Sequence, residues 1–290
     1  MKTISLAAVS LFLAGGCDKL CDNCDTPLGT CAPTDVMFYP LEPGAWWRDS
    51  VIDPLTDLPQ CPDKVVSIGE LGPIVSAGAE RTPLRPDVTA FVAYSDRENA
   101  LGRRWQSIED NAVYREVDEW FKPKDDGTPG ERSKIVFYCP RALRAPGGVI
   151  ACAGTHFTEH YRQGTLTAAT PEDWPACLAL PVARDTCELQ ADHPGCVMER
   201  AEVAADWTIE AIDEPLSTPL GDFKTLRMRE VVRVDGELDD TQVQWWAAGL
   251  GKIKEAHEPL EEEFLVDSCV PALGCDRPAP QWAEMKTHCQ

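Results

Sequence analysis

The sequence has no apolar run as long as a membrane-spanning helix requires, which is about 20 residues. Its longest apolar stretch, Ile4 to Leu13, has ten residues. Basic residues are also scarce, because 27 Lys and Arg face 48 Asp and Glu and leave a net charge of −21. Nucleic acids and anionic head groups bind to basic surfaces. The sequence therefore predicts no transmembrane helix and no nucleic-acid partner.

Motifs that bind nucleotides or build common active sites are missing as well. The chain contains no P-loop, no G-x-G-x-x-G fingerprint and no serine in G-x-S-x-G. Residues Asp235 to Asp240 lack the twelve-residue loop of an EF-hand, and Glu261 to Glu263 is more typical of a solvated face than of an acid–base pair. We therefore predict a protein that is not an enzyme, with no catalytic residues, no cofactor and no bound metal.

The start of the chain has the pattern of a secretory signal peptide. Lys2 precedes the apolar run, and the small residues Ala14, Gly15 and Gly16 follow it. We therefore expect residues 1–16 to be removed from an exported protein.

The stretch LAGGC, which ends at Cys17, resembles the lipobox of bacterial lipoproteins. In that family the chain is cut before the cysteine, which then carries acyl chains, palmitate among them. The resemblance implies that Cys17 anchors the protein to a membrane of the bacterial cell envelope, facing the periplasm or the cell surface. The alternative is an ordinary signal peptide cut nearby, which would leave Cys17 free or paired.

Cysteine is abundant, and an exported chain meets an oxidising compartment in which disulfides persist. Of the 13 cysteines, all except Cys17 are disulfide candidates. Sequence alone does not fix their connectivity, but short loops close easily. Local pairing is expected within 177/187/196 and within 269/275/289, and Cys139 with Cys152 would bridge a hairpin. The candidates are Cys21, Cys24, Cys31, Cys61, Cys139, Cys152, Cys177, Cys187, Cys196, Cys269, Cys275 and Cys289.

The spacing of Cys21 and Cys24 is also that of zinc sites and of thioredoxin-like redox pairs. Zinc would need a second such pair or a histidine pair, and no histidine occurs before His156. A redox pair would need a preceding strand and a following helix. A structural disulfide is therefore the favoured interpretation.

Segments 88–94 and 134–139 are rich in residues that favour strands, and 203–212 alternates with the period of a strand. They predict a mainly β fold, a curved antiparallel sheet or partly open β-barrel that is rich in disulfides and has few short helices. Residues 113–121 fit a helix or a strand. We expect a tether over 17–33 and one β-rich domain over 34–290, with a disulfide-pinned insertion near 171–199. A division into two domains near 165–200 is the alternative.

Two features allow sharper hypotheses. His156, Glu159 and His160 match the H-x-x-E-H motif of zinc peptidases, with Glu230 as a possible third ligand, but that geometry requires a helix. On a strand the two histidines would lie about 13 Å apart. The pairs Trp46-Trp47 and Trp245-Trp246 would each place one ring in the core and the other on the outside, where it packs on the sheet or lines a binding cleft.

Two further stretches carry a resemblance. MFYPLEPGAWW near the start, and STPLGDFKTLRMRE followed by QWWAAGLGKIKEAH near the end, are similar to uncharacterised envelope lipoproteins of the TapB43-like and DUF3108-like type. The resemblance implies a curved sheet or partly open barrel and supplies no catalytic residues. We expect a binding or structural module of the envelope, whose partner is an envelope protein or a small apolar ligand. The alternatives are a zinc-dependent hydrolase and a carrier of hydrophobic ligands.

Overall fold

A computed structural model describes residues 31–53, 58–59, 61–77, 81–97, 100–126, 128–148, 151–257, 261–281 and 284–285. The expected signal peptide, the predicted lipid site Cys17 and the disulfide candidates Cys21, Cys24 and Cys289 lie outside these residues. The strands are β1 (Trp46–Asp53), β2 (Leu58–Pro59), β3 (Lys64–Val75), β4 (Pro83–Arg97), β5 (Ala100–Glu109), β6 (Ala112–Pro123), β7 (Pro129–Ala145), β8 (His156–Ala168), β9 (Cys196–Thr218), β10 (Gly221–Val234), β11 (Glu237–Ala247), β12 (Gly251–His257) and β13 (Glu261–Cys269).

Helical structure in the described residues is short. It comprises η1 (Pro171–Asp173), α1 (Trp174–Ala179) and η2 (Pro271–Leu273). The ambiguous segment 113–121 lies in strand β6. None of the described helices has the length and apolar character needed to cross a bilayer.

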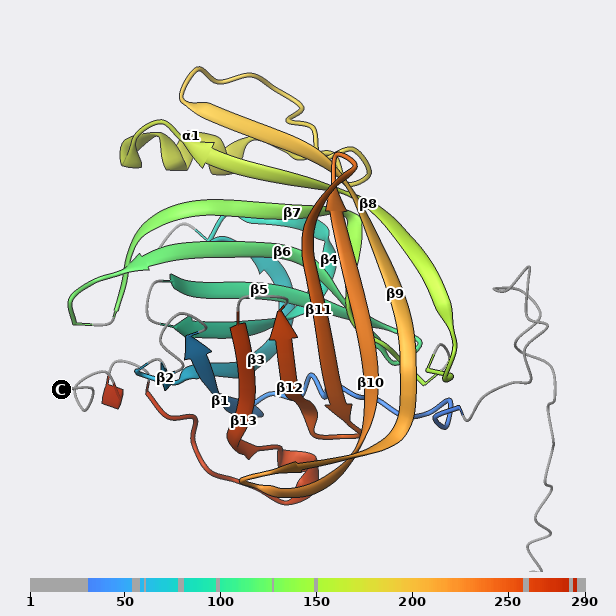
Figure 1. Cartoon of the computed structure of the whole chain (residues 1–290). Helices are drawn as coiled ribbons and strands as arrows, with labels where there is room; N and C mark the ends of the chain where they lie inside the picture. Colours follow the sequence, from blue (N-terminus) through green and yellow to red (C-terminus); the bar gives the residue numbers. More distant parts are fainter. Residues whose placement is uncertain are drawn as a thin grey trace, which may run out of the picture.

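The strands form one antiparallel meander in which each strand from β3 to β12 pairs with the next strand in the chain. The first strand, β1, pairs with β3 on one side and with β13 on the other, so the sheet closes into a barrel (Figure 1). The short strand β2 pairs with β1 alone. The prediction of a mainly β, disulfide-rich fold is confirmed, and the β1–β13 pairing closes the sheet fully. Closure removes the exposed edges of an open sheet.

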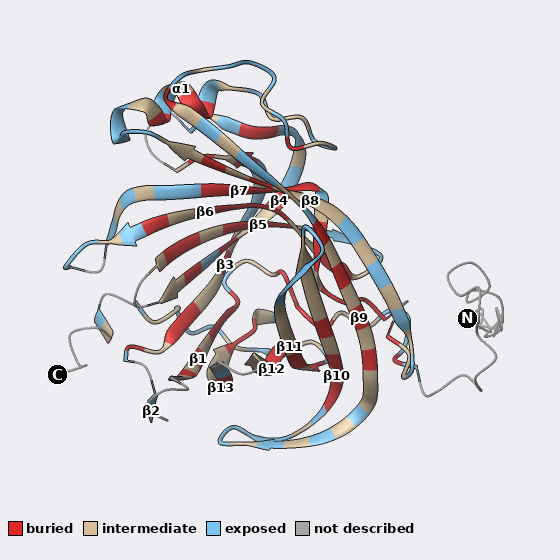
Figure 2. Cartoon of the chain, turned by 45° about the horizontal axis from the view of Figure 1, so that its top comes forward, coloured by how far each residue is buried: buried red, intermediate tan, exposed pale blue. Residues whose placement is uncertain are grey.

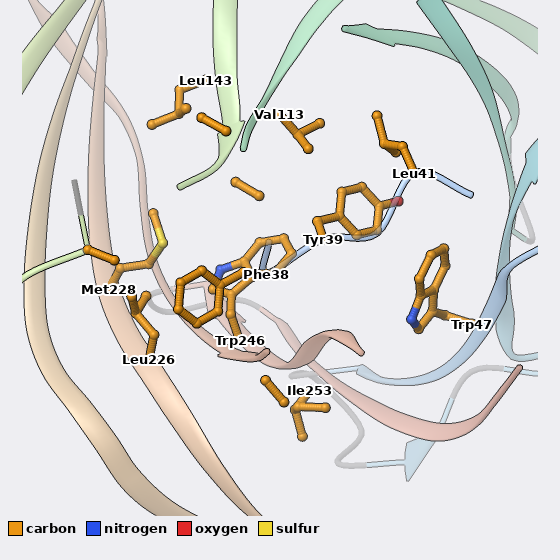
Figure 3. Packing of buried hydrophobic residues seen from close by; sticks show 14 of the residues in the cluster. Phe38, Tyr39, Leu41, Trp47, Val113, Leu143, Leu226, Met228, Trp246 and Ile253 are labelled. Atoms are coloured by element: carbon orange, nitrogen blue, oxygen red, sulfur yellow. The ribbon is translucent and has the colours of Figure 1, made fainter. Parts of the chain in front are cut away.

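Alternation along the strands separates an inner from an outer side, and Figure 2 shows buried residues interspersed with exposed ones. The segment 31–45, which precedes β1, contributes buried side chains to the inner core. Phe38, Tyr39 and Leu41 are each less than a tenth exposed. The ring of Tyr39 lies 5.1 Å from that of Trp47 and 5.7 Å from that of Trp246 (Figure 3). This aromatic packing fills one part of the barrel interior.

A second core lies on the outer side of the sheet, where the connection between β8 and β9 covers it. Helix α1 in this connection buries Trp174, Cys177 and Leu178 in the same cluster as Phe137 of β7 and Leu166 of β8. The connection spans residues 169–195, so the expected insertion ends before Glu199, which lies in β9.

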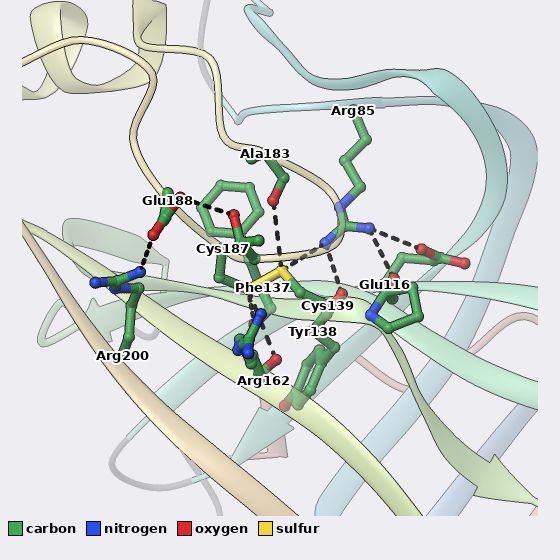
Figure 4. The surroundings of a disulfide bond; sticks show 12 residues. Arg85, Glu116, Phe137, Tyr138, Cys139, Arg162, Ala183, Cys187, Glu188 and Arg200 are labelled. Atoms are coloured by element: carbon green, nitrogen blue, oxygen red, sulfur yellow. Dashed lines mark hydrogen bonds and ion pairs between the residues drawn. A yellow bond between two sulfur atoms is a disulfide. The ribbon is translucent and has the colours of Figure 1, made fainter.

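Disulfide bonds fasten this outer connection to the barrel. One joins Cys177 to Cys196, and another joins Cys139 to Cys187 (Figure 4). Next to the second bond, the buried guanidinium of Arg85 donates to the carbonyl of Tyr138 at 2.6 Å and pairs with Glu116 at 3.3 Å. The outer core is therefore held by covalent bonds as well as by packing.

The expected Cys139–Cys152 bond is not formed. Cys139 lies within β7 and faces the outer core, whereas Cys152 follows the end of that strand and bonds to Cys31. A further bond joins Cys269 to Cys275, and Cys61 is disulfide-bonded too. The hairpin pairing was wrong because strand alternation points the first sulfur away from the second.

Candidate functional site

The barrel interior contains a cavity of about 530 Å³, lined by side chains from β3–β8 and β11–β13. We call it the lumen cavity. Its lining residues lie on the same strand faces as the inner core. Lys64 and Ile68 share one face of β3, and Glu263 and Leu265 share one face of β13. Its cations are Lys64, Arg97, Arg104, Arg115, Lys134 and Arg144. Its carboxylates are Asp118, Asp239, Asp240, Glu255 and Glu263.

One side of the lumen cavity is a chain of paired charges. Glu263 contacts Lys64 at 2.5 Å and Lys252 at 2.9 Å, and Lys252 contacts Glu255 at 2.7 Å. Burial would raise the pKa of the Glu263 carboxyl, but Lys252 and Lys64 hold the pKa well below its usual range. Each carboxylate named here therefore has a cation beside it, as buried charges require.

The same chain of charges continues to a histidine. The two ring nitrogens of His257 each lie 3.0 Å from a carboxylate, one from Asp240 and the other from Glu255. The hydrogen bonds to Asp240 and then to Glu255 raise the pKa of His257 to about 10. The imidazole is therefore a cation at neutral pH, and it completes the pairing on this side.

The opposite side, which we call the cationic wall, comprises Arg97, Arg104, Arg115 and Lys134 on β4–β7. The carboxylate among them is Asp118, whose Oδ2 lies 3.8 Å from Arg104 Nε. In the described part of the chain, Arg97, Arg115 and Lys134 form no ion pair. The cationic wall thus has more positive than negative groups.

Two guanidinium groups of the cationic wall have donors without a partner. Neither Arg104 Nε nor Arg115 Nε has a hydrogen-bond acceptor within the described residues, and both atoms are buried. Arg104 is 9% exposed, and burial lowers its pKa to about 10. Buried polar groups are normally satisfied, so unpaired donors that line a cavity indicate a place for a ligand or for water.

An aromatic ring lies beside these cations. The guanidinium carbon of Arg104 lies 4.9 Å from the ring centroid of Trp120, and that of Arg97 lies 5.9 Å away. The Tyr138 hydroxyl donates to Asp118 Oδ2 at 3.1 Å. Cation–π contacts and this hydrogen bond restrict the side chains before any ligand arrives.

Sequence reasoning missed this group because its members come from four separate strands. One signal was present in the sequence, because residues two positions apart in a strand share a face. Residues 118 and 120 in β6 and residues 134, 136 and 138 in β7 follow this spacing and line the lumen cavity.

The H-x-x-E-H residues do not converge. They lie on β8, whose alternation turns the exposed His156 and His160 outward and the half-buried Glu159 inward. Glu159 accepts from the backbone N–H of Leu143 at 3.0 Å, and burial raises its pKa to about 7. Glu230 is buried on β10. No metal-binding cluster occurs among the residues that the structure describes. The zinc-site hypothesis was wrong because the motif forms a strand.

The tryptophan pairs fit the packing alternative and not a binding cleft. Both Trp46 and Trp47 are buried, at 1% and 3% exposure. The outer ring, Trp46, lies beneath the segment that follows β13, donates to the carbonyl of Arg277 at 2.9 Å and contacts its guanidinium. Trp245 is half-buried near Lys254, and Trp246 is fully buried. The outer rings are therefore packing residues, and the tryptophan in the lining of the lumen cavity is Trp120.

Two grooves occur on the outer surface, with volumes of about 530 and 670 Å³. They share Ser76 and Arg103, and the larger is lined by Tyr94 and Leu71, which are exposed. Neither has the convergent charges of the lumen cavity. The apolar part of the barrel interior is filled by the inner core, which weighs against a carrier of hydrophobic ligands.

Comparisons with known proteins give the following similarities. No family model matches the chain, and no curated protein matches it significantly. A solved structure of a protein inferred to be exported, with a YmcC-like fold, from Bacteroides fragilis has a TM-score of 0.45 at 10% identity, covering 80% of this chain and 99% of that one. A protein inferred to be a lipoprotein from Parabacteroides distasonis has a TM-score of 0.33 at 11% identity, covering 80% and 98%.

Proposed function

We propose that the protein is an exported binding module of the bacterial cell envelope that holds a small polar ligand in the lumen cavity. The observation that supports this most is the cavity itself, about 530 Å³ in volume and lined by side chains from nine strands, most of them charged. This volume lies in the usual range of small-molecule sites, about 300–1,000 Å³. The unpaired buried donors of Arg104 and Arg115 favour a ligand over a purely structural interior.

Export and anchoring are the second part of the proposal. The signal-like start and the lipobox-like LAGGC support it, and so do disulfides that join distant parts of the chain, such as Cys31 and Cys152. We expect the intact mass of the mature, membrane-purified protein to show a chain that begins at acylated Cys17. A mature chain without lipid, or one that retains residues 1–16, would contradict the anchor and leave the binding proposal standing.

Ligand binding is tested by filling the cavity. Gln163 lines it from β8, whereas its neighbour Arg162 is exposed on the other side of the strand. Glucose, glycine, choline, citrate and inorganic phosphate serve as thermal-shift probes, and native mass spectrometry shows any ligand retained from the envelope. We expect a retained ligand or a stabilising probe with the wild type and with Arg162→Trp, but not with Gln163→Trp.

Two outcomes would reject ligand binding in the lumen. One is a wild-type protein that retains no ligand from the envelope and that no probe stabilises, which would leave a structural role for the charged interior. The other is binding that survives in Gln163→Trp, which would place the ligand elsewhere. Circular dichroism of both variants shows whether the barrel still forms.

A further inference from the structure

Resting on the proposed function, we propose that the lumen cavity selects an anionic ligand, whose phosphate or carboxylate group binds to Arg104 and Arg115 beside Trp120. These residues belong to strands β5 and β6. The inference defines the chemical class of the ligand.

The first support is the uneven distribution of charge across the cavity. On the side of β12 and β13, Glu255 and Glu263 are matched by Lys64, Lys252 and His257. On the cationic wall four cations face the carboxylate of Asp118. A protein with a net charge of −21 has thus gathered unmatched positive charge inside its barrel. Such a concentration of cations in a low-dielectric cavity attracts an anion.

The second support is that hydrogen-bond donors of Arg104 and Arg115 have no acceptor within the described chain. Arg104 approaches Asp118 at 3.8 Å, beyond hydrogen-bonding distance, and its Nε has no acceptor among the described residues. Arg115 is hydrogen-bonded to Tyr138 and has the carboxyl groups of Asp118 and Glu230 as neighbours. Its Nε nevertheless lacks an acceptor in that same part of the chain. A guanidinium presents a planar fork of donors that matches carboxylate and phosphate oxygens. Two guanidinium groups whose Nε donors are buried and unpaired therefore form a site for an oxyanion.

The third support is that the donors are held in place. Arg104 lies over the ring of Trp120 at 4.9 Å, and Asp118 is fixed by the hydroxyl of Tyr138 at 3.1 Å. Asp118 therefore orients the cations and leaves spare donors for the ligand. A prearranged site loses less conformational entropy on binding.

The chemistry of the cavity argues against the other ligand classes. An apolar ligand would have to desolvate the charged groups without replacing their hydrogen bonds, which is costly. A cation would meet the surplus of positive charge on the cationic wall. A volume of about 530 Å³ admits a small molecule and not a folded macromolecule.

The test uses matched probes and matched variants of the full mature chain. Phenyl phosphate and benzoate share a ring and differ in the anion, so together they distinguish the two sources of negative charge, and choline is the cationic control. The variants are Arg104→Gln and Arg115→Gln. Arg103→Gln is the control, because Arg103 precedes Arg104 on β5 but lines the outer grooves. Isothermal titration in a buffer of low chloride gives the dissociation constants.

We expect phenyl phosphate or benzoate to bind, with affinity at least about tenfold weaker in Arg104→Gln and Arg115→Gln and unchanged in Arg103→Gln. If Arg104→Gln unfolds, the double variant Arg104→Gln/Asp118→Asn removes both charges and should show the same loss. Quenching of Trp120 fluorescence, absent in Trp120→Phe, places the ligand on the cationic wall.

The inference is overturned if choline or glucose binds and is lost in Gln163→Trp, while both anions fail to bind. In that case the lumen is a binding site and the proposed function stands. It is also overturned if an anion binds equally well to Arg104→Gln and Arg115→Gln. If no probe binds and the protein from the envelope is bare, the proposed function fails together with the inference.

Discussion

Buried carboxylates of the barrel interior differ in pKa because their neighbours differ. Glu263 has two lysines within 2.9 Å, and its pKa lies far below the usual value. Glu230 is as fully enclosed, and its Oε2 accepts from the amide of Gln242, a neutral donor. Burial therefore raises the pKa of Glu230 to about 8, despite the more distant Arg115 and Arg144. One residue type gives opposite pH behaviour because desolvation and charge pairing oppose each other.

Glu230 should make the protein less stable as the pH rises. Its folded pKa of about 8 lies above the ordinary value of 4.5, so between these values the folded state binds more protons than the unfolded state. The free energy of unfolding falls across that window. Glu230→Gln keeps the shape and an acceptor for Gln242 but does not ionise. We expect it to be more stable than the wild type at pH 8.5, on the order of 2–4 kcal/mol, with little difference at pH 4.5.

Urea unfolding of Glu230→Gln at pH 4.5, 6.5 and 8.5 provides the measurement. Glu237→Gln, at an exposed site in the β10–β11 hairpin, is the control and should follow the wild type. Parallel profiles for Glu230→Gln and the wild type would show that Glu230 is ionised in the folded state at neutral pH.

Elements of the fold differ in how far local sequence determines them. The β-rich stretches 88–94 and 134–139 and the alternating stretch 203–212 lie within β4, β7 and β9, because β-rich composition and a period of two are local properties. The segment 31–45 and the connection 169–195 lack such a period. The segment 31–45 lies inside the barrel, and its position depends on contacts with residues more than 100 positions away. The connection 169–195 lies over the outer side, where two disulfides hold it. Sequence reasoning therefore predicted strands and an insertion near 171–199, but not where the insertion or the segment 31–45 would pack.

The disulfide of segment 31–45 should contribute more stability than a short-range one. Cys31 and Cys152 are separated by 121 residues, whereas Cys269 and Cys275 are separated by 6. A cross-link restricts the unfolded chain more when its loop is longer, and the loop-entropy relation gives about 5 and about 2 kcal/mol. We expect Cys31→Ser/Cys152→Ser to lower the free energy of unfolding by about 3 kcal/mol more than Cys269→Ser/Cys275→Ser. Guanidinium unfolding followed by circular dichroism measures both, and equal losses would contradict the prediction.

The closed barrel depends on pairing between its first and last strands, β1 and β13. Strand β1 pairs with β13, so Trp46 lies opposite Cys269, and the lumen exists because this pairing closes the sheet. Local patterns predicted a mainly β fold, yet closure joins residues more than 200 positions apart and leaves no local trace. The same holds for the cationic wall, whose members become neighbours only when β4–β7 curve around one interior. The residues of the site could be named from the sequence as charged strand positions, but not as a group.

Closure also brings charged residues of early and late strands together, and we expect these buried ion pairs to stabilise the whole fold. Glu263 of β13 contacts Lys64 of β3, which lies 199 residues earlier, and Lys252 of β12. Glu263→Gln removes the negative charge between two buried ammonium groups, and breaking a buried pair in this way costs about 3 kcal/mol or more. The neighbouring Glu262 forms a 3.2 Å pair with Lys254 and is 49% exposed, so Glu262→Gln should cost less than about 1 kcal/mol.

Urea unfolding of Glu263→Gln and Glu262→Gln at neutral pH compares the two losses directly. The folded pKa of Glu263 is lowered, so its stabilisation is present above the unfolded value of about 4.5 and is lost as the pH falls below it. The difference between the two variants should therefore shrink toward pH 2. Equal losses at neutral pH would mean that hydrogen bonding along β1 and β13, rather than the buried ion pairs, closes the barrel.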